Sequence, residues 1–374
     1  MESDDRIERL IMAGNDSKEI TREKNEHKWT DLRSLAHEEL CDAVLALGER
    51  RFRGDQVYDW IHRKLVREPE EMRNVPAAFR ERLLADHPFY GVRELEHYVS
   101  KIDGTRKYLF ELHDGNVIES VLMRYRHGNS VCISSQAGCR MGCSFCASTL
   151  MGLSRNLYPS EMLDQIYMIQ KSIGERVSHI VVMGTGEPLD NFEGLHRFLT
   201  LISDAGGLNI SPRNITVSTC GLVPEIYRFA DLHPQVTLAI SLHAPEDELR
   251  RTMMPIANRY SLNELMEAAG YYVSKTGRRI SFEYSLVRGV NDQMSHAGML
   301  ADLVRGLNCH INLIPVNPIK ERDYVSSDKD RVGRFKKYLE SEHIQVTVRR
   351  EMGRDIQAAC GQLRKSYKER SGNP

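Results

Sequence analysis

Residues 130–146 read SVCISSQAGCRMGCSFC, and this stretch decides the fold prediction. It opens with a strand pattern at Ser130–Ser134 and continues into three cysteines with C-x3-C-x2-C spacing, Cys139, Cys143 and Cys146. From here to Val348, strand patterns alternate with helical ones, which predicts a parallel α/β barrel or partial barrel. Chemistry in such barrels takes place at the C-terminal ends of the strands, so the three cysteines lie where a functional loop is expected.

Seven strands and six helices are expected in this part of the chain. The strands are Ser130–Ser134, His179–Met183, Asn214–Thr219, Gln235–Ser241, Arg279–Ser285, His310–Ile314 and Gln345–Val348. The helices are Ser160–Ile173, Phe192–Ser203, Val223–Phe229, Leu262–Lys275, His296–Gly306 and Arg331–Glu342. Together they predict an α/β fold with a partial (βα)6 TIM-like barrel over residues 130–348.

The segments on either side of the barrel have different patterns. Residues 1–29 are dense in both charge signs and are expected to be a mobile extension. Residues 30–97 show apolar side chains at i, i+3, i+4 spacing, which predicts a small helical accessory domain. Residues 98–129 alternate as short strands between turn signals, and residues 349–374 read as a polar C-terminal tail.

The composition of the 374 residues narrows the class of protein. Apolar residues make up 41% and charged residues 28%, and the formal net charge of −1 gives the whole chain no bias towards polyanions. No apolar run is long enough to span a membrane, and the first thirty residues lack a secretory apolar region. A cytoplasmic location is therefore expected. In a reducing compartment, four cysteines between positions 132 and 146 indicate metal or redox chemistry.

Three closely spaced thiolates suit a 4Fe-4S cluster in which the fourth iron stays open. An open iron can chelate the amino and carboxylate groups of S-adenosylmethionine (SAM), and an electron from the cluster can cleave the sulfonium bond. Phe145, just before the last cysteine, would shield the cluster or contact the adenine. The alternative is a structural zinc site, although zinc usually has four ligands in paired Cys or His units, and no second C-x2-C occurs.

Short polar motifs follow several of the predicted strands. Gly184-Thr185-Gly186-Glu187-Pro188 follows the second strand, where glycines permit close backbone approach to a ligand and Glu187 can accept from an ammonium group. Further candidates for binding the ribose, carboxylate and adenine of SAM are Ser218, Ser241, Leu242, His243 and Asn317. Each of them could equally be a turn or capping residue.

The motifs together resemble one family. CISSQAGC, CRMGCSFC, GTGEP, SLHAP, NLIPVNP and DIQAACGQL occur here in the order and spacing of the radical SAM adenine-C2 RNA methyltransferases, the RlmN type. The resemblance runs from about Asp31 to Leu363 and does not cover the first thirty residues. It implies methylation of carbon 2 of an adenosine in 23S rRNA and in certain tRNAs, with a 4Fe-4S cluster and SAM as cofactors.

The resemblance also implies a mechanism. Carbon 2 of adenine is not nucleophilic, so the family first transfers a methyl group from SAM to a cysteine, which corresponds to Cys360. A radical derived from a second SAM takes a hydrogen atom from that methyl group, and the resulting carbon radical adds to the base. A second cysteine, corresponding to Cys132, then attacks the Cys360 sulfur, so that a disulfide forms and the base leaves. Glu119 corresponds to the proton acceptor, although its sequence context also fits an outward residue on an edge strand.

The remaining implied residues and partners follow the family pattern. The SAM contacts correspond to Gly186, Glu187, Ser218, Ser241, Leu242, His243 and Asn317, and the cluster ligands to Cys139, Cys143 and Cys146. A flavodoxin-type electron donor and a monomeric chain are expected. Two basic stretches, Arg50–Arg67 and Arg349–Arg370, are expected to contact RNA phosphates. Their alternative interpretation is a solvated charged surface.

Three other functions stay open. The nearest is methylation of adenine carbon 8 by the same mechanism; Pro188 favours carbon 2, because the carbon-8 enzymes tend to carry alanine after the glutamate. The second is a non-catalytic RNA-binding protein stabilised by zinc. The third is a radical SAM enzyme acting on a peptide or small molecule, for which Cys132 and Cys360 would be dispensable.

Overall fold

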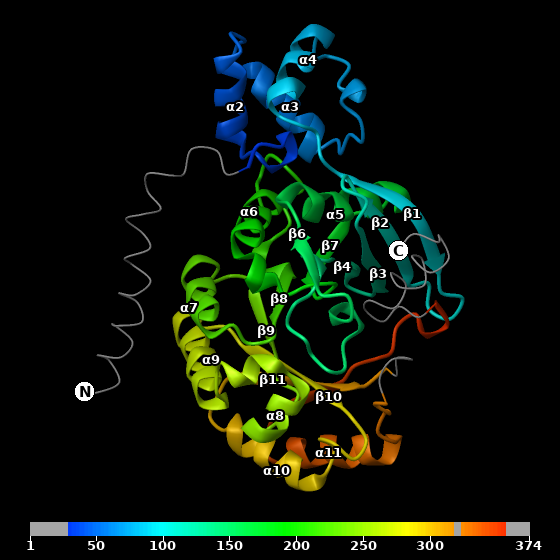
Figure 1. The fold of residues 1–374 in the computed structure, drawn as a ribbon, viewed down its shortest axis with the longest axis vertical. Coiled ribbons are helices and arrows are strands. Elements are labelled where there is room, and N and C mark those ends of the chain that lie inside the picture. Colours follow the sequence, from blue (N-terminus) through cyan, green and yellow to red (C-terminus); the bar gives the residue numbers. More distant parts are fainter. Residues whose placement is uncertain (1–28, 318–322, 357–374) are drawn as a thin grey trace, which may run out of the picture.

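The computed structural model describes residues 29–317 and 323–356. Three helices form the N-terminal part, and a large sheet surrounded by further helices forms the rest (Figure 1). No helix in the described ranges is long and apolar enough to cross a membrane. The predicted methyl-carrying cysteine, Cys360, lies outside the described residues, as do most of the expected N-terminal extension and most of the C-terminal tail.

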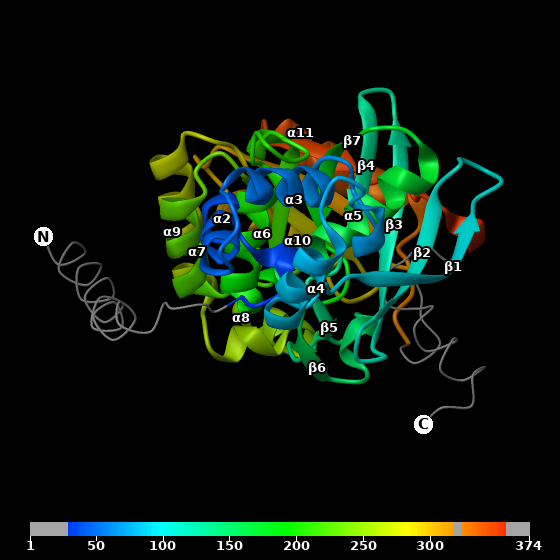
Figure 2. The same ribbon diagram turned by 90° about the horizontal axis from the view of Figure 1, so that it is seen from above.

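The N-terminal helices are α2 (His37–Ala46), α3 (Phe52–His62) and α4 (Ala77–Asp86). Helices α2 and α3 cross closely because a Cβ at Gly54 would lie only 2.7 Å from the Cys41 sulfur. Beside this crossing, His37 Nε2 and Asp55 Oδ1 are 2.8 Å apart and hydrogen-bonded. Buried leucine and valine side chains of these helices join the main apolar core, so the helices are packed onto the barrel rather than tethered to it (Figure 2).

An ion pair fixes this packing. Arg33 and Asp164, both almost fully buried, have Nη1 and Oδ2 2.8 Å apart. Arg33 also donates to the carbonyl of Val66 at 2.7 Å. Since a buried pair that loses one partner leaves an uncompensated charge, this contact holds the helical segment in one orientation on the barrel.

Ten strands form one open sheet in the order β1-β2-β3-β4-β7-β8-β9-β10-β11-β12. The first four are β1 (Val92–Val99), β2 (Arg106–Leu112), β3 (Val117–Tyr125) and β4 (Gly128–Cys132). The next six are β7 (Val177–Val182), β8 (Ile215–Thr219), β9 (Thr237–Ser241), β10 (Ile280–Leu286), β11 (Cys309–Pro315) and β12 (Gln345–Val348). Strands β1 to β4 pair antiparallel, and β4 together with β7 to β12 pairs parallel.

Helices connect the parallel strands, as right-handed βα repeats require. They are α5 (Pro159–Ile173), α6 (Phe192–Ile202), α7 (Val223–Leu232), α8 (Asp247–Met253), α9 (Leu262–Thr276), α10 (Met294–Leu303) and α11 (Lys329–Ser341). A two-stranded hairpin, β5 (Gln136–Gly138) and β6 (Leu153–Asn156), brackets the three cysteines. The predicted α/β fold with a partial barrel and N-terminal helices is confirmed, and each of the seven strands and six helices expected in the barrel is present.

Three elements were not predicted. Most of strand β1 (Val92–Val99) lies in the range 30–97 that was expected to be helical, and the helices there end at Asp86. Its side chains are mostly half-buried or exposed, so it shows little of the alternation that marks a strand. The seven-residue helix α8 and the β5–β6 hairpin were missed because both are too short for periodicity to reveal.

The two faces of the sheet have different environments. On β2 and β3, Tyr108 and Ser120 hydrogen-bond to side chains of α5, so the face that carries them points towards the helices. We call it the outer face. The opposite face carries Lys107, Glu119 and Cys132, and we call it the inner face.

Candidate functional site

The cysteine loop, residues 139–152, follows β5 at the C-terminal end of β4. Cys139 and Cys143 are buried and Cys146 is partly exposed. An apolar cluster surrounds Cys143, with Met141 and Phe145 of the loop packed against it; its buried members are Cys220, Ala244, Met253, Met254, Val287 and Val316. The predicted cluster ligands therefore lie together on one loop with a dry side and an accessible side.

The donor set fits an iron–sulfur cluster. Burial raises the pKa of the Cys139 thiol to about 12 and raises that of Cys143 too, and the neighbouring cysteines add to both shifts. Adjacent thiolates are therefore costly here unless cations lie among them, which is what iron ions provide. Cys139, Cys143 and Cys146 would hold three irons of a 4Fe-4S cluster and leave the fourth iron open.

Zinc fits the same loop less well. The ligand atoms of a tetrahedral zinc site lie about 3–4 Å apart, given Zn–S bonds of about 2.3 Å. Within the described ranges, the group of three side chains whose ligand atoms all lie within 4.8 Å of one another is His37, Cys41 and Asp55, on the N-terminal helices. The loop cysteines are spaced more widely, as expected for thiolates on separate corners of an iron–sulfur cube. The group of His37, Cys41 and Asp55 is explained by the hydrogen bond between His37 and Asp55, which joins helices α2 and α3.

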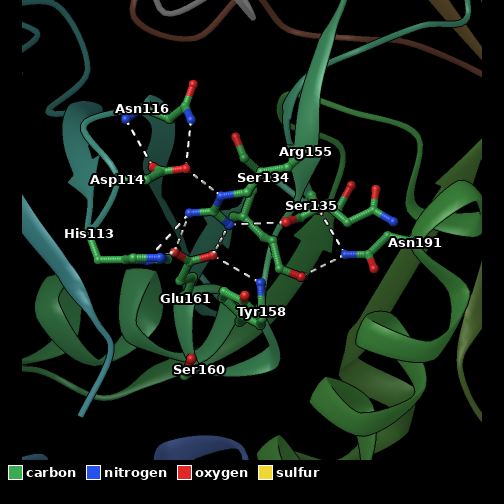
Figure 3. A network of polar contacts seen from close by, with 12 residues as sticks. His113, Asp114, Asn116, Ser134, Ser135, Arg155, Tyr158, Ser160, Glu161 and Asn191 are labelled. Atoms are coloured by element: carbon green, nitrogen blue, oxygen red, sulfur yellow. Dashed lines mark hydrogen bonds and ion pairs between the residues drawn. The ribbon is translucent and has the colours of Figure 1, made fainter. Parts of the chain in front are cut away.

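A polar network anchors the base of the cysteine loop (Figure 3). Arg155, on β6 just after the loop, donates to Asp114 Oδ2 at 2.6 Å and to both carboxylate oxygens of Glu161 at 2.7 and 2.8 Å. Glu161 is fully buried at the start of α5 and also accepts from the backbone N–H of Tyr158. The network ties the loop to the β2–β3 turn and to α5, so the loop has a fixed base.

The glycines of the 184–186 motif have a structural explanation. A Cβ at Gly184 would lie 2.7 Å from the carbonyl oxygen of Ile133, and one at Gly186 would lie 2.6 Å from Gln136. Gly186 also has a positive φ of 109°. These glycines allow the motif to pack against residues 133–136, which lead into the cysteine loop, so the close approach is to the chain itself.

Glu187 connects two strand ends. Its buried carboxylate accepts from the backbone N–H groups of Cys220 at 2.7 Å and of Leu189 at 3.1 Å. Burial raises the pKa of Glu187, and these hydrogen bonds oppose that shift. Pro188 occupies the first position of the short helix that Glu187 caps. The proline therefore has a local structural role, which weakens its value as a marker of carbon-2 specificity.

The Ser241-Leu242-His243 motif lies close to the cysteine loop. The Phe145 and His243 rings meet edge to face with centroids 4.7 Å apart. His243 has a positive φ of 58°, and its Nδ1 accepts from the backbone N–H of Ser285 at 3.0 Å. Burial, with a smaller contribution from Arg250, lowers the pKa of His243 to about 3, so the ring is neutral at physiological pH. The motif joins β9, β10 and the cysteine loop.

The strand register places Glu119 and Cys132 on the inner face. Val121 pairs with Cys132, and Glu119 lies two residues before Val121 on the same strand. Glu119 is buried on an interior strand and makes an ion pair with Lys107, whose Nζ is 3.2 Å from Oε2. The alternative of an outward residue on an edge strand is therefore wrong, and Lys107 was missed because its pairing is not local in sequence.

The same face continues across the parallel strands. Cys132 pairs with Val181, Val181 with Thr216, Ser218 with Ala239 and Ser241 with Glu283. Paired positions lie on one side of a sheet, so Ser218 and Ser241 share the inner face with Glu119 and Cys132. Both serines are partly accessible.

Glu283 was missed by sequence reasoning. It is buried on β10, and Asn312 donates to its Oε1 at 3.3 Å, while Oε2 has no hydrogen-bond partner in the described ranges. Burial raises the pKa of this carboxyl. Asn317, the sixth-strand candidate, is exposed where the first described range ends. For Glu283, the available signal in the sequence was a charged residue among apolar neighbours in a predicted strand.

The described chain ends beside the β1–β2 turn. Asp355 accepts from Ser100 Oγ at 2.6 Å and from the backbone N–H of Lys101 at 2.9 Å, and Asp103 accepts from the backbone N–H of Gly353 at 3.0 Å. Residues 349–356 thus run from β12, at one edge of the sheet, to the β1–β2 turn near the other edge (Figure 1). No disulfide joins two of the seven cysteines in the described ranges.

The first basic stretch is partly neutralised. Arg51 forms an ion pair with Glu38, and both Arg63 and Lys64 form ion pairs with Asp59. Lys64 also lies over the Trp60 ring at 3.9 Å. Local acidic partners reduce the positive potential that these residues offer to phosphates.

Comparisons with known proteins agree with this geometry. The radical SAM superfamily model matches residues 133–297, and the model for a ribosomal RNA large subunit methyltransferase N-terminal domain matches residues 30–87. A Lachnospira eligens protein named probable dual-specificity RNA methyltransferase RlmN is 60% identical over 340 residues, covering 91% of this chain and 97% of its own. A protein of the same name from Clostridium botulinum is 53% identical, covering 88% and 96%. The crystal structure of a radical SAM methyltransferase from Sphaerobacter thermophilus has a TM-score of 0.85 and 42% identity, covering 89% and 99%.

Proposed function

The chain belongs to the RlmN family of radical SAM RNA methyltransferases, and we propose that it methylates carbon 2 of adenosine in 23S rRNA and in tRNAs. Radical SAM membership implies a 4Fe-4S cluster and SAM, which supply an electron, a methyl group and a radical when bound. We further propose a cytoplasmic monomer with a flavodoxin-type electron donor.

Four groups of residues in the chain have separate roles in the proposed reaction. In this proposal Cys139, Cys143 and Cys146 hold the cluster, and Gly186, Glu187, Ser218, Ser241, Leu242, His243 and Asn317 surround SAM. Cys360 carries the methyl group to the base as a thioether. The Cys132 sulfur then attacks the Cys360 sulfur, so that an S–S bond forms while the C–S bond to the methylated base breaks. Glu119 accepts a proton.

The observation that carries the proposal is the shared inner face. Cys132 and Glu119 lie on it with Ser218 and Ser241. The described chain stops four residues before Cys360, at a point fixed to the β1–β2 turn by Asp355. The position of Cys132 on the same face as Glu119 supports a role for this cysteine in the reaction. A radical SAM enzyme acting on a peptide would have no use for Cys132 and Cys360.

Lys107 supports the role of Glu119. A buried ammonium 3.2 Å from the carboxylate supplies a counter-charge, so the negative charge of a proton acceptor is compensated inside the barrel. Lys107 is then a positioning residue, because it acts through Glu119 rather than on the base.

The proposal is tested by identifying the product. The cluster is reconstituted anaerobically, SAM, a reductant and an unmodified 23S rRNA fragment are added, and the digested nucleosides are analysed by mass spectrometry against 2-methyladenosine and 8-methyladenosine standards. We expect 2-methyladenosine from the wild-type chain, none from Cys360→Ala, and an undiminished yield from the matched control Cys309→Ala, a buried cysteine at the start of β11.

The other outcomes are equally informative. An 8-methyladenosine peak would keep the mechanism and overturn the carbon-2 assignment. SAM cleavage with no methylated adenosine from 23S rRNA or tRNA would overturn the RNA specificity. Product from Cys360→Ala would overturn the methyl-carrier role of that cysteine.

A further inference from the structure

Arg250 is a buried cation at the ends of two strands. It lies on α8 with no exposed surface, and its guanidinium donates to backbone carbonyls of the strand ends. Nη2 is 2.7 Å from the carbonyl oxygen of Cys220, and Nε is 3.2 Å from that of Leu242. Arg250 therefore holds the ends of β8 and β9, which carry Ser218 and the Ser241-Leu242-His243 motif, in fixed positions.

One N–H donor of the buried Arg250 guanidinium has no partner in the described ranges. None of the ion pairs there includes Arg250, and Nη1 has no hydrogen-bond partner. A buried cation with an unpaired donor destabilises a fold because neither water nor a protein group satisfies that donor. A fold that keeps such a group gives it an anionic or strongly accepting partner when the site is complete.

The cysteine loop is the neighbour that can supply that partner. The backbone N–H of Ser144 donates to the carbonyl of Met253, at the end of α8, at 2.9 Å, and Ser144 Oγ donates to the same oxygen at 3.2 Å. Cys143 packs in one apolar cluster with Met253 and Cys220. Burial lowers the pKa of Arg250, and the nearby sulfurs of Cys220 and Cys143 and the carboxylate of Asp247 oppose that shift.

We propose that Arg250 donates a hydrogen bond from Nη1 to sulfur at the Cys143 corner of the 4Fe-4S cluster and thereby raises the cluster's reduction potential. This inference rests on the cluster assigned to the loop under the proposed function. Thiolates give the bound cluster negative charge, which a nearby guanidinium compensates. Hydrogen bonds to sulfur and nearby positive charge both favour the reduced cluster, because reduction adds an electron to the site.

Arg250 is a positioning residue with two effects. Its carbonyl contacts fix the strand ends, and its remaining N–H group tunes the cluster. Arg250 stands next to Arg251 in the short helix Asp247–Met253, and no local pattern distinguishes the buried arginine from the exposed one. Arg251 is exposed on the same helix and provides a matched control.

The first test uses the unaltered sequence. The full chain is produced with arginine that carries 15N only in the guanidinium group, so that the backbone nitrogen of Arg140 beside Cys139 stays unlabelled, and is then reconstituted, reduced with dithionite and examined by pulsed electron paramagnetic resonance without SAM. We expect a 15N hyperfine coupling to the reduced cluster that is absent from Arg250→Lys and retained in Arg251→Lys. Absence of arginine coupling in the wild-type chain would overturn the inference. A coupling that appears only after SAM is added would also overturn it, because the guanidinium would then face SAM.

The second test measures the potential. Redox titration of reconstituted Arg250→Lys and Arg250→Met should show an equilibrium constant for cluster reduction at least about tenfold lower than wild type, which is about 59 mV for a one-electron couple. Arg251→Met should leave the potential unchanged. A cluster-loaded Arg250→Met with the wild-type potential would overturn the inference, and if that variant does not fold, the 15N measurement decides.

The two proposals fail differently. A wild-type chain that forms no cluster would overturn both. A wild-type chain that makes 2-methyladenosine and shows neither the coupling nor the potential shift would overturn the role of Arg250 alone.

Discussion

The outer and inner faces of the sheet alternate along the same strands yet differ in chemistry. On β3, Ile118 points outward into the main apolar core, while its neighbour Glu119 points inward to Lys107. The outer face is closed by helices and holds the fold together through burial of apolar side chains. The inner face carries acids, thiols and hydroxyl groups in a curved sheet with two open edges. Neighbouring residues on one strand therefore serve different purposes, one stability and the next chemistry. Substitutions at adjacent positions such as Ile118 and Glu119 test this division.

The largest expected effect is on the inner face at Cys132. Cys132→Ala should reduce multiple-turnover methylation by more than about 10³-fold, because the base cannot be released from Cys360. A change of one buried sulfur atom to hydrogen should leave unfolding in urea within about 1 kcal/mol of wild type. Methylation rates and urea midpoints on the same preparation would measure both. Sustained turnover by Cys132→Ala would break the assignment of chemistry to this face.

Glu119→Gln is expected to have the next largest effect on turnover. Loss of a proton acceptor typically costs about 10²–10⁴-fold, and we expect the lower end because solvent can partly replace it. The variant should also be less stable, since Lys107 loses its counter-charge. A double variant, Lys107→Met with Glu119→Gln, should regain stability without regaining turnover. Recovery of turnover in the double variant would show that Glu119 acts only through stability.

The outer-face counterpart is Ile118→Ala. Removing this fully buried side chain should cost about 2–5 kcal/mol of unfolding free energy, because it leaves a cavity against the helices. Methylation per folded molecule should stay within about threefold of wild type. Urea unfolding and rates normalised to cluster content would give the two quantities. A large drop in the normalised methylation rate would contradict the assignment of stability to the outer face and of chemistry to the inner face.

The smallest expected effect is the pH dependence at Glu283. Burial raises the pKa of this carboxyl above its ordinary 4.5, so the folded chain binds the proton more tightly than the unfolded chain does. Its contribution to stability is therefore present below about pH 4.5 and is lost as the pH rises through the folded pKa. Glu283→Gln should remove this loss, so the unfolding free energy of the variant should exceed that of the wild type by more at pH 8 than at pH 5. Exposed Glu248→Gln is the control, and equal pH profiles for Glu283→Gln and wild type would contradict the prediction.

The sequence predicted the elements whose pattern is local. The parallel strands and the longer helices of the barrel were predictable because burial on one or both sides leaves a period of 2 or 3.6 in the residues themselves. The three cluster cysteines were predictable because their spacing within one loop is itself the signal. Strand β1 was not, since its largely accessible side chains carry no clear alternation.

The missed site residues depend on contacts between distant segments. Lys107 and Glu283 are single charges on strands, and only the register of the neighbouring strands shows that both lie on the inner face. The burial of Arg250 depends on the docking of α8 against the cysteine loop, which no local sequence pattern reveals. The sequence analysis interprets Gly184 and Gly186 as glycines that let a ligand approach the backbone. In the structure, residues 133–136 of the chain itself occupy the space beside both glycines.

The most direct test of the account is to trap the covalent intermediate that the two cysteines imply. Cluster-loaded Cys132→Ala, given SAM, reductant and a radiolabelled 23S rRNA fragment, is run on a denaturing protein gel. We predict labelled RNA that migrates with the protein and is lost in the Cys132→Ala, Cys360→Ala double variant. A folded, cluster-loaded Cys132→Ala chain with no protein-bound RNA, or with RNA bound equally in the double variant, would contradict the central claim.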